Sequence, residues 1–203
     1  APTRADQKDM PVDPVHIRKV VILESTEELT ETDENPDQDI ANWAVSFIEN
    51  YDRTEPFFLA VGFNLPHQPW RVPHWAYSLY HCVSSPVPAG NDLDVIPPKG
   101  VALANSRTAL GLQYNLVSVA GKAVFYTQAY LAGISHTDAM VGLLLEALAD
   151  SPHAATTDIV FWSDHGYHLG EKFHWRKSSL WEQSVKVPLL VKAPGYPAGD
   201  VTD

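Results

Sequence analysis

The chain has 203 residues, of which 45% are hydrophobic, and its 14 Lys and Arg against 25 Asp and Glu give a formal net charge of −11. This charge argues against nucleic acid and anionic membranes as partners, because both would repel the protein. The length allows one sizeable core. Because Cys82 is the single cysteine, an internal disulfide is excluded. No apolar run has the length expected of a transmembrane segment.

The first 35 residues are rich in prolines and acids. This composition is typical of an exposed connecting segment, with at most a short strand at residues 19–23. From Pro36 onward, apolar residues recur at helical spacing, which predicts an amphipathic helix with Pro36 and Asp37 in its first turn. The sequence therefore divides into a polar connecting segment, residues 1–35, and a domain, residues 36–203.

Helical and strand patterns alternate along the rest of the chain. The uninterrupted apolar run at residues 57–63 predicts a strand that is covered on both faces. Residues 66–121 show no sustained period, residues 123–149 predict a long helix, and residues 158–162 and 187–191 predict two further strands. This order predicts an α/β fold with a mostly parallel central sheet flanked by helices.

Two groups of polar residues follow predicted strands directly, and this is where ligands bind in open α/β sheets. His67 follows the first strand, and Asp164, His165 and Gly166 follow the second. An Asp-His pair can offer a carboxylate oxygen and an imidazole nitrogen to one metal ion, and glycine permits close backbone approach. Without further context, Asp164 is equally well explained as a turn residue, and a lone histidine such as His67 is more often a surface or packing residue.

The loop that follows is basic, although the protein as a whole is acidic. Lys172, Arg176 and Lys177 could together hold a sulfate or phosphate through charge-assisted hydrogen bonds. The alternative is a solvated surface loop above Trp175 and Trp181. The basic loop lies after a predicted buried strand, and this position favours the anion site over the solvated surface loop.

Three segments resemble sulfatases of the iduronate-2-sulfatase type, within the alkaline-phosphatase superfamily. Residues 163–177, SDHGYHLGEKFHWRK, resemble the metal-binding segment of that family. Residues 56–70, PFFLAVGFNLPHQPW, resemble its strand-and-histidine segment, and residues 130–148, YLAGISHTDAMVGLLLEAL, resemble the helix before the metal strand. The three motifs occur in the family's order. The resemblance implies an alkaline-phosphatase-like fold, with residues 36–203 forming part of a sulfatase catalytic domain.

The resemblance also implies roles for individual residues. Asp164 would bind a divalent cation, most often Ca²⁺, and His165 would be a second ligand or a sulfate contact. His67 would protonate the leaving oxygen or stabilise charge on it, and Lys177 would stabilise the transition state. Calcium prefers six to eight oxygen ligands, whereas a histidine ligand by itself indicates zinc or manganese. Further candidate substrate-binding residues are Tyr167, His168, Lys172 and His174.

Sulfatases use a formylglycine nucleophile made from a C/S-x-P-x-R motif, which this sequence does not contain; Cys82 is not followed by that pattern. We therefore expect an incomplete catalytic domain that is inactive alone and self-associates through exposed sheet edges.

The sequence thus favours a sulfuric ester hydrolase acting on a sulfated small molecule or carbohydrate. One alternative is a phosphate or phosphonate ester hydrolase of the same superfamily, and another is an inactive, truncated homologue that only binds anions. The composition leaves the cellular location open, while the family resemblance implies a periplasmic, secreted or lysosomal protein.

Overall fold

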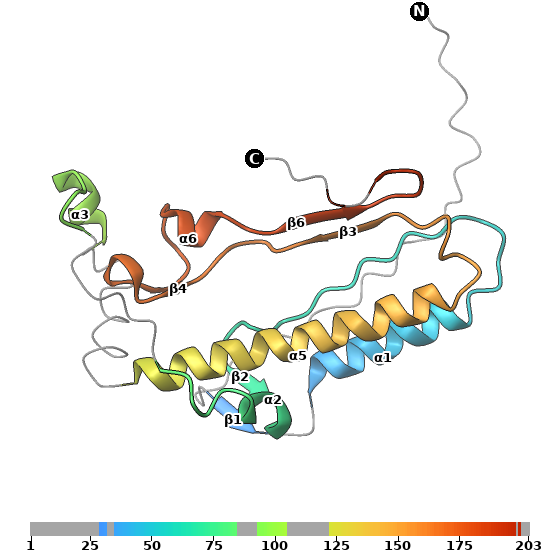
Figure 1. The fold of residues 1–203 in the computed structure, drawn as a ribbon, viewed down its shortest axis with the longest axis horizontal. Helices are drawn as coiled ribbons and strands as arrows, with labels where there is room; N and C mark the ends of the chain where they lie inside the picture. Colours follow the sequence, from blue (N-terminus) through green and yellow to red (C-terminus); the bar gives the residue numbers. More distant parts are fainter. Residues whose placement is uncertain (1–28, 32–34, 85–92, 105–121, 198, 200–203) are drawn as a thin grey trace, which may run out of the picture.

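The computed structural model describes residues 29–31, 35–84, 93–104, 122–197 and 199. The strand predicted at residues 19–23 lies outside this part of the chain. Helices α1 (Pro36–Glu49) and α5 (Ala123–Ala149) lie side by side in one layer, and the strands β3 (Ile159–Trp162) and β6 (Leu189–Lys192) run along α5 (Figure 1). The helices are α1 (Pro36–Glu49), α2 (His74–Ser78), α3 (Pro98–Ala104), α5 (Ala123–Ala149) and α6 (Glu182–Val185), with a short 3₁₀ helix η3 (Glu171–Phe173).

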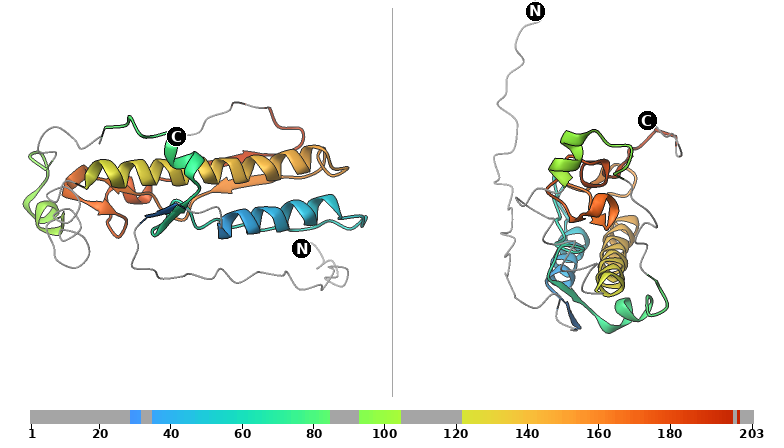
Figure 2. Two further views of the ribbon diagram at one scale, coloured as in Figure 1. Left: turned by 90° about the horizontal axis from the view of Figure 1, so that it is seen from below. Right: turned by 90° about the vertical axis from the view of Figure 1, so that its left-hand side faces the viewer.

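Helix α1 begins where the sequence predicts it, because its N-terminus is well capped. The side chain of Asn35 accepts a hydrogen bond from the Asp37 N–H at 2.9 Å, and Pro36 occupies the first turn. The helix buries one stripe, and Ala41 and Ala44 are fully buried. These small residues let α1 pack closely beside α5, as both views in Figure 2 show.

Helix α5 confirms the helix predicted at residues 123–149 and is the central support of the fold. It contacts α1, α2 and the strand β2 (Trp70–Val72). By length and composition alone α5 could cross a bilayer, which differs from the expectation from sequence. A core helix of a soluble protein passes the same test, so this is weak evidence for a membrane span.

The strands of the described residues form three two-stranded sheets. The strand β1 (Leu29–Glu31) pairs in parallel with β2, and it lies inside the segment predicted to be a connection. The other pairs are antiparallel: β3 (Ile159–Trp162) with β6 (Leu189–Lys192), and β4 (His168–Leu169) with β5 (Trp175–Arg176). The two strands predicted near residues 158–162 and 187–191 are therefore present, but a mostly parallel central sheet is not confirmed.

The apolar run at residues 57–63 is extended without a strand partner among the described residues. Its side chains alternate between half-buried and exposed, and Phe58 is 75% exposed. Only one face is packed, so the prediction of a strand covered on both faces is wrong for this chain. An apolar run reports a tendency to be buried, but it does not specify the chain that covers it.

The β3–β6 pair also exposes apolar side chains. Val160, Trp162, Leu189 and Val191 are between 51% and 68% exposed. A contiguous apolar surface of this kind favours association with another surface. Self-association, which was expected from the sequence, stays a prediction that this surface supports.

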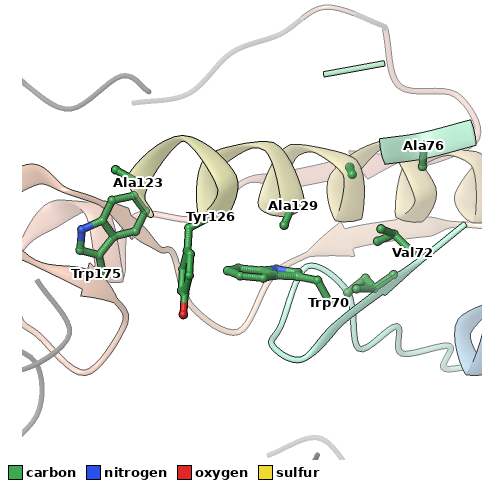
Figure 3. Close-up of a cluster of buried hydrophobic side chains, with 9 residues drawn as sticks. Trp70, Val72, Ala76, Ala123, Tyr126, Ala129 and Trp175 are labelled. Carbon is green, nitrogen blue, oxygen red and sulfur yellow. The ribbon is translucent and has the colours of Figure 1, made fainter. Parts of the chain in front are cut away.

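The hydrophobic core joins α5 to two separate loops. In Figure 3, Tyr126 of α5 lies between Trp70 of β2 and Trp175 of β5. The ring centroids of Trp70 and Tyr126 are 5.2 Å apart, and those of Tyr126 and Trp175 are 6.0 Å apart, both in edge-to-face geometry. The segment after His67 and the basic loop are therefore anchored on the same helix.

Candidate functional site

The basic loop predicted after Gly166 is a β-hairpin. Strands β4 and β5 pair His168 with Arg176, and η3 forms the turn between them. The turn is closed by hydrogen bonds from the Leu169 N–H to the Glu171 carboxylate at 2.7 Å and from the Gly170 N–H to the His174 carbonyl at 2.9 Å. Gly170, with φ 119°, supplies the left-handed backbone that starts this turn.

Gly166 brings the backbone that follows Asp164 and His165 against α6. Its N–H donates to the Ser184 carbonyl at 2.8 Å, and a Cβ atom at this position would lie 2.0 Å from the Gln183 carbonyl oxygen. No other residue fits so close to another backbone. Glycine is therefore required here by the approach to α6, while its predicted role beside a metal ion stays a prediction.

One of the predicted site residues, His165, contacts two others, Asp164 and Lys177. His165 Nε2 lies 2.6 Å from the Lys177 Nζ and 3.5 Å from the Asp164 Oδ2, and His165 Nδ1 lies 2.8 Å from the Gly166 carbonyl oxygen. These contacts are consistent with a neutral imidazole whose Nδ1–H donates to Gly166 and whose Nε2 accepts from the ammonium. The Asp164 side chain is 81% exposed, so its carboxylate is open to other groups.

Asp164 and His165 fit two positions of a metal shell. A histidine that binds a metal usually donates its other ring N–H to a carbonyl or carboxylate, as Nδ1 of His165 does to Gly166. Within the described residues, no group of three or more His, Cys, Asp or Glu side chains gathers to hold a metal ion. Any complete shell would therefore include other groups, and binding through Nε2 would require Lys177 to release this nitrogen.

His168 and His174, two of the predicted substrate-binding residues, lie inside the hairpin. His168 is fully buried, and its ring nitrogens lie 3.1 Å from the Glu171 carbonyl oxygen and 3.0 Å from the Ser179 hydroxyl. His174 is 4% exposed, and its Nε2 lies 3.1 Å from the Lys177 carbonyl oxygen. Both imidazoles thus hold the hairpin together, and substrate contact would require an exposure that neither has here.

The other two predicted substrate-binding residues lie against aromatic rings. Tyr167 stacks on Tyr130 of α5, with ring centroids 4.6 Å apart and an interplanar angle of 26°. The Lys172 Nζ lies 5.8 Å from the centroid of a Trp181 ring, a cation–π contact. These contacts fix Tyr167 to the central helix and hold Lys172 over Trp181, the residue before α6.

The burial of His174 predicts a loss of stability on acidification. Burial lowers the pKa of His174 below its usual value, although the hydrogen bond with the Lys177 carbonyl partly opposes this shift. Because the unfolded chain then binds the proton more readily, protonation of His174 favours unfolding. The contribution of neutral His174 to stability is fully present above the pKa of the unfolded state and is lost as the pH falls through the lowered pKa of the folded state. We expect His174→Gln to reduce the loss of stability, measured by urea unfolding between about pH 7.5 and pH 5.

Exposed His81 provides the control for this experiment. The variant His81→Gln should keep the pH dependence of the parent protein. Some dependence should also persist in His174→Gln, because burial lowers the pKa of His136 as well. An identical pH dependence in His174→Gln and the parent would contradict the assignment.

His67 lies on a separate loop, which α5 also supports. Its side chain is exposed, with Nδ1 against the Gln68 carbonyl oxygen. The backbone N–H of His67 donates to the Asn64 carbonyl at 2.9 Å. Pro66 packs on Gly133 of α5, where a Cβ atom would lie 3.1 Å from it. No hydrogen bond within the described residues joins His67 to Asp164, His165 or Lys177.

The two loops are nevertheless neighbours along α5. Tyr130 supports the segment with Tyr167, and Gly133 supports the segment with Pro66. A helix rises 1.5 Å per residue, so these two support points lie about 4.5 Å apart along the axis. The structure therefore brings Asp164, His165 and Lys177 into contact and places the His67 loop one turn further along the same helix.

Sequence reasoning missed the polar residues that support the two loops. Ser179 joins His168 to Ser184 through its hydroxyl, at 3.0 and 2.8 Å. Asp37 was predicted only as a first-turn residue, yet its carboxylate is buried and bonds to the backbone before His67. A first-turn aspartate is ordinary in any helix, so no local signal marked it.

Comparison with known proteins identifies the family. Residues 2–200 match the family model described as Sulfatase. A sulfatase from Formosa agariphila is 40% identical over 171 residues, covering 83% of this chain and 33% of that protein. Human iduronate 2-sulfatase is 33% identical over 177 residues, covering 80% of this chain and 31% of that protein. The chain thus spans about a third of the length of these relatives.

A solved structure supports the same fold. The structure of BT4656 in complex with its substrate D-glucosamine-2-N,6-O-disulfate has a TM-score of 0.61 at 22% identity, covering 78% of this chain and 43% of that chain. The chain thus shares its fold with this structure, while the mostly parallel central sheet predicted from the sequence is not confirmed. From the family match over nearly its whole length and the relative at 40% identity, we conclude that the chain belongs to the sulfatase family.

Proposed function

We propose that the complete protein containing this chain is a sulfuric ester hydrolase, which releases inorganic sulfate from a sulfated small molecule or carbohydrate. The observation that carries the proposal is the contact of Asp164, His165 and Lys177, in a segment of a sulfatase-family chain. The names of the relatives favour sulfate over phosphate esters. The name iduronate 2-sulfatase favours a carbohydrate among the sulfated substrates.

The site residues can divide the work of sulfate hydrolysis. The Lys177 ammonium lies beside His165 and, when it turns from the His165 Nε2 toward the substrate, offers a positive charge to the sulfate oxygens, where it would stabilise the charge of the transition state. The exposed imidazole of His67 is available to protonate the leaving oxygen. The nucleophile would be a formylglycine supplied by a part of the complete protein outside this chain.

Asp164 and His165 would hold a divalent cation, for which we propose Ca²⁺. When bound, the cation would supply positive charge that neutralises the sulfate group. The open carboxylate of Asp164 suits a hard cation, since Ca²⁺ prefers oxygen ligands. His165 can act as its second ligand if Lys177 turns from Nε2 toward the substrate.

The product of the full open reading frame tests the proposal. We expect it to release sulfate from a chromogenic aryl sulfate and from a sulfated uronic acid, with loss of activity after treatment with EDTA. Restored activity with Ca²⁺, but not with Zn²⁺ or Mn²⁺, would support the cation assignment. Stoichiometric zinc or manganese together with phosphatase activity would overturn it, and an open reading frame without a C/S-x-P-x-R motif would exclude the formylglycine mechanism.

A further inference from the structure

We propose that Asp37 is a positioning residue, whose buried carboxylate at the start of α1 fixes the backbone that carries His67. This inference rests on the proposed function, because it assumes that His67 acts in sulfate ester hydrolysis. The proposed role is indirect. Asp37 contacts the main chain of the loop and leaves the imidazole exposed.

Both oxygens of the Asp37 carboxylate bind the start of the His67 loop. Oδ1 accepts the Asn64 N–H at 2.9 Å, and Oδ2 accepts the Leu65 N–H at 2.8 Å. These residues lie 27 and 28 positions further along the chain, so the bonds join two distant segments. Two parallel bonds to one carboxylate restrict rotation as well as translation of the peptide groups.

The first turn of α1 also holds the other end of the loop. Asn35 caps the helix through its side-chain oxygen, and its Nδ2 donates to the Arg71 carbonyl at 2.6 Å. Between these two anchors, Trp70 Nε1 donates to the Pro66 carbonyl at 2.8 Å. Asn35 and Asp37 therefore hold the loop at its two ends, residues 64–65 and residue 71.

Helix α5 closes the loop from the opposite side. The Thr137 hydroxyl lies 3.1 Å from the Leu65 carbonyl oxygen and 3.0 Å from the Gly133 carbonyl oxygen, so its one proton is shared between the loop and α5. Both polar groups of the Leu65 backbone thus have a side-chain partner. Within this framework, the His67 side chain is exposed. A loop that is held on two sides and presents one open imidazole is suited to fixing that group relative to a substrate.

The burial of Asp37 distinguishes it from an ordinary helix-start aspartate. Asp37 is 1% exposed, whereas Asp39 in the same turn is exposed and can interact with the helix dipole without desolvation. Burial raises the pKa of Asp37, and the two backbone N–H groups and the nearby His136 oppose that shift. A buried carboxylate is costly unless its oxygens are bonded, so its two bonds to the loop offset the cost of its burial.

The test uses the product of the full open reading frame with an aryl sulfate. Asp37→Asn keeps the shape of the side chain but turns an amide NH₂ toward one of the two N–H groups. We expect kcat to fall about 10- to 100-fold with KM nearly unchanged, because misplacement of a catalytic group by about 1 Å can cost on the order of 100-fold. The matched control, Asp39→Asn, should keep the parent kcat.

A double-mutant cycle with His67→Ala separates positioning from general stability. If Asp37 acts through His67, Asp37→Asn should cost less than about twofold in the His67→Ala background. An equal loss in both backgrounds, with His67→Ala itself slow, would overturn the positioning role alone. An unchanged kcat in His67→Ala would remove His67 from the proposed mechanism and Asp37 with it.

Thr137 provides a second variant in case Asp37→Asn does not fold. Thr137→Val removes the hydroxyl that binds Leu65 but keeps the shape and leaves Asp37 in place, while Thr137→Ser restores the donor. We expect a lower kcat in the valine variant, recovery in the serine variant, and no additional loss from valine in the His67→Ala background. Equal kcat in the valine and serine variants would overturn the proposal that the bonded backbone of Leu65 positions His67.

Discussion

Replacement of Lys177 by methionine is expected to lower kcat/KM of the complete enzyme for an aryl sulfate by about 100- to 1,000-fold, the usual cost of removing one preorganised charge-stabilising group. The Lys177 Nζ lies 2.6 Å from the His165 Nε2, so the ammonium lies beside the proposed cation site before substrate binds. Methionine keeps an unbranched side chain of nearly the same length but carries no charge. Initial rates across a range of substrate concentrations would measure the effect.

Lys186 is the matched control for this variant. It lies in the same stretch of chain, its side chain is 77% exposed, and it pairs with Glu182 of α6 at 3.4 Å. An exposed pair of this kind contributes about 0–1 kcal/mol to stability, so Lys186→Met should keep the parent kinetics. A loss of less than about threefold in Lys177→Met would place this lysine outside the sulfate site.

Gly166→Ala is expected to destabilise the protein by about 3 kcal/mol. Overpacking costs about 1–3 kcal/mol, and weakening of one hydrogen bond adds about 1 kcal/mol. The new methyl group would meet the carbonyl oxygen of Gln183 at 2.0 Å and that of Lys186 at 3.0 Å. Both are backbone atoms, so relief requires the chain after His165 to move away from α6. Urea unfolding at pH 7 would measure the change in free energy.

Gly142 offers the opposite outcome with the same substitution. It lies inside α5, and a Cβ atom there would meet nothing within 4 Å. Alanine is a better helix former than glycine, so Gly142→Ala should stabilise the protein by about 0.5–1 kcal/mol. A change of the same sign in both variants would contradict the close approach at Gly166.

The two long helices, α1 and α5, could be predicted from the sequence because their signals are local, whereas the short helices α2, α3 and α6 were not predicted. The bounds of α1 and α5 follow from apolar spacing and from Pro36 in the first turn. Strands β3 and β6 were located in the same way, but their partners were not, and β1, β2, β4 and β5 were not predicted. Strand β3 pairs with β6, about 30 residues away. Whether two strands pair in parallel or antiparallel depends on the path of the chain between them.

The site could be predicted only in part. The order of three motifs brought Asp164, His165 and Lys177 together, and their contact is present in the structure. His168 and His174 share that basic segment, yet they are buried, because a sequence of alternating polar and aromatic residues does not show which side of a hairpin faces inward. The supporting role of Asp37 was invisible for a similar reason, since its partners lie 27 and 28 residues away.

The shared support on α5 has a consequence for how the two loops move. Because the contacts at Tyr130 and Gly133 lie on consecutive turns of one rigid helix, and Asp37 binds the His67 loop to α1, a movement of α1 and α5 as one unit would carry both loops together. The separation between the imidazole of His67 and the hairpin would then survive changes in helix packing elsewhere in the protein. Substitutions that alter how this pair of helices packs against the rest of the protein should therefore affect stability before they affect the spacing of the catalytic groups.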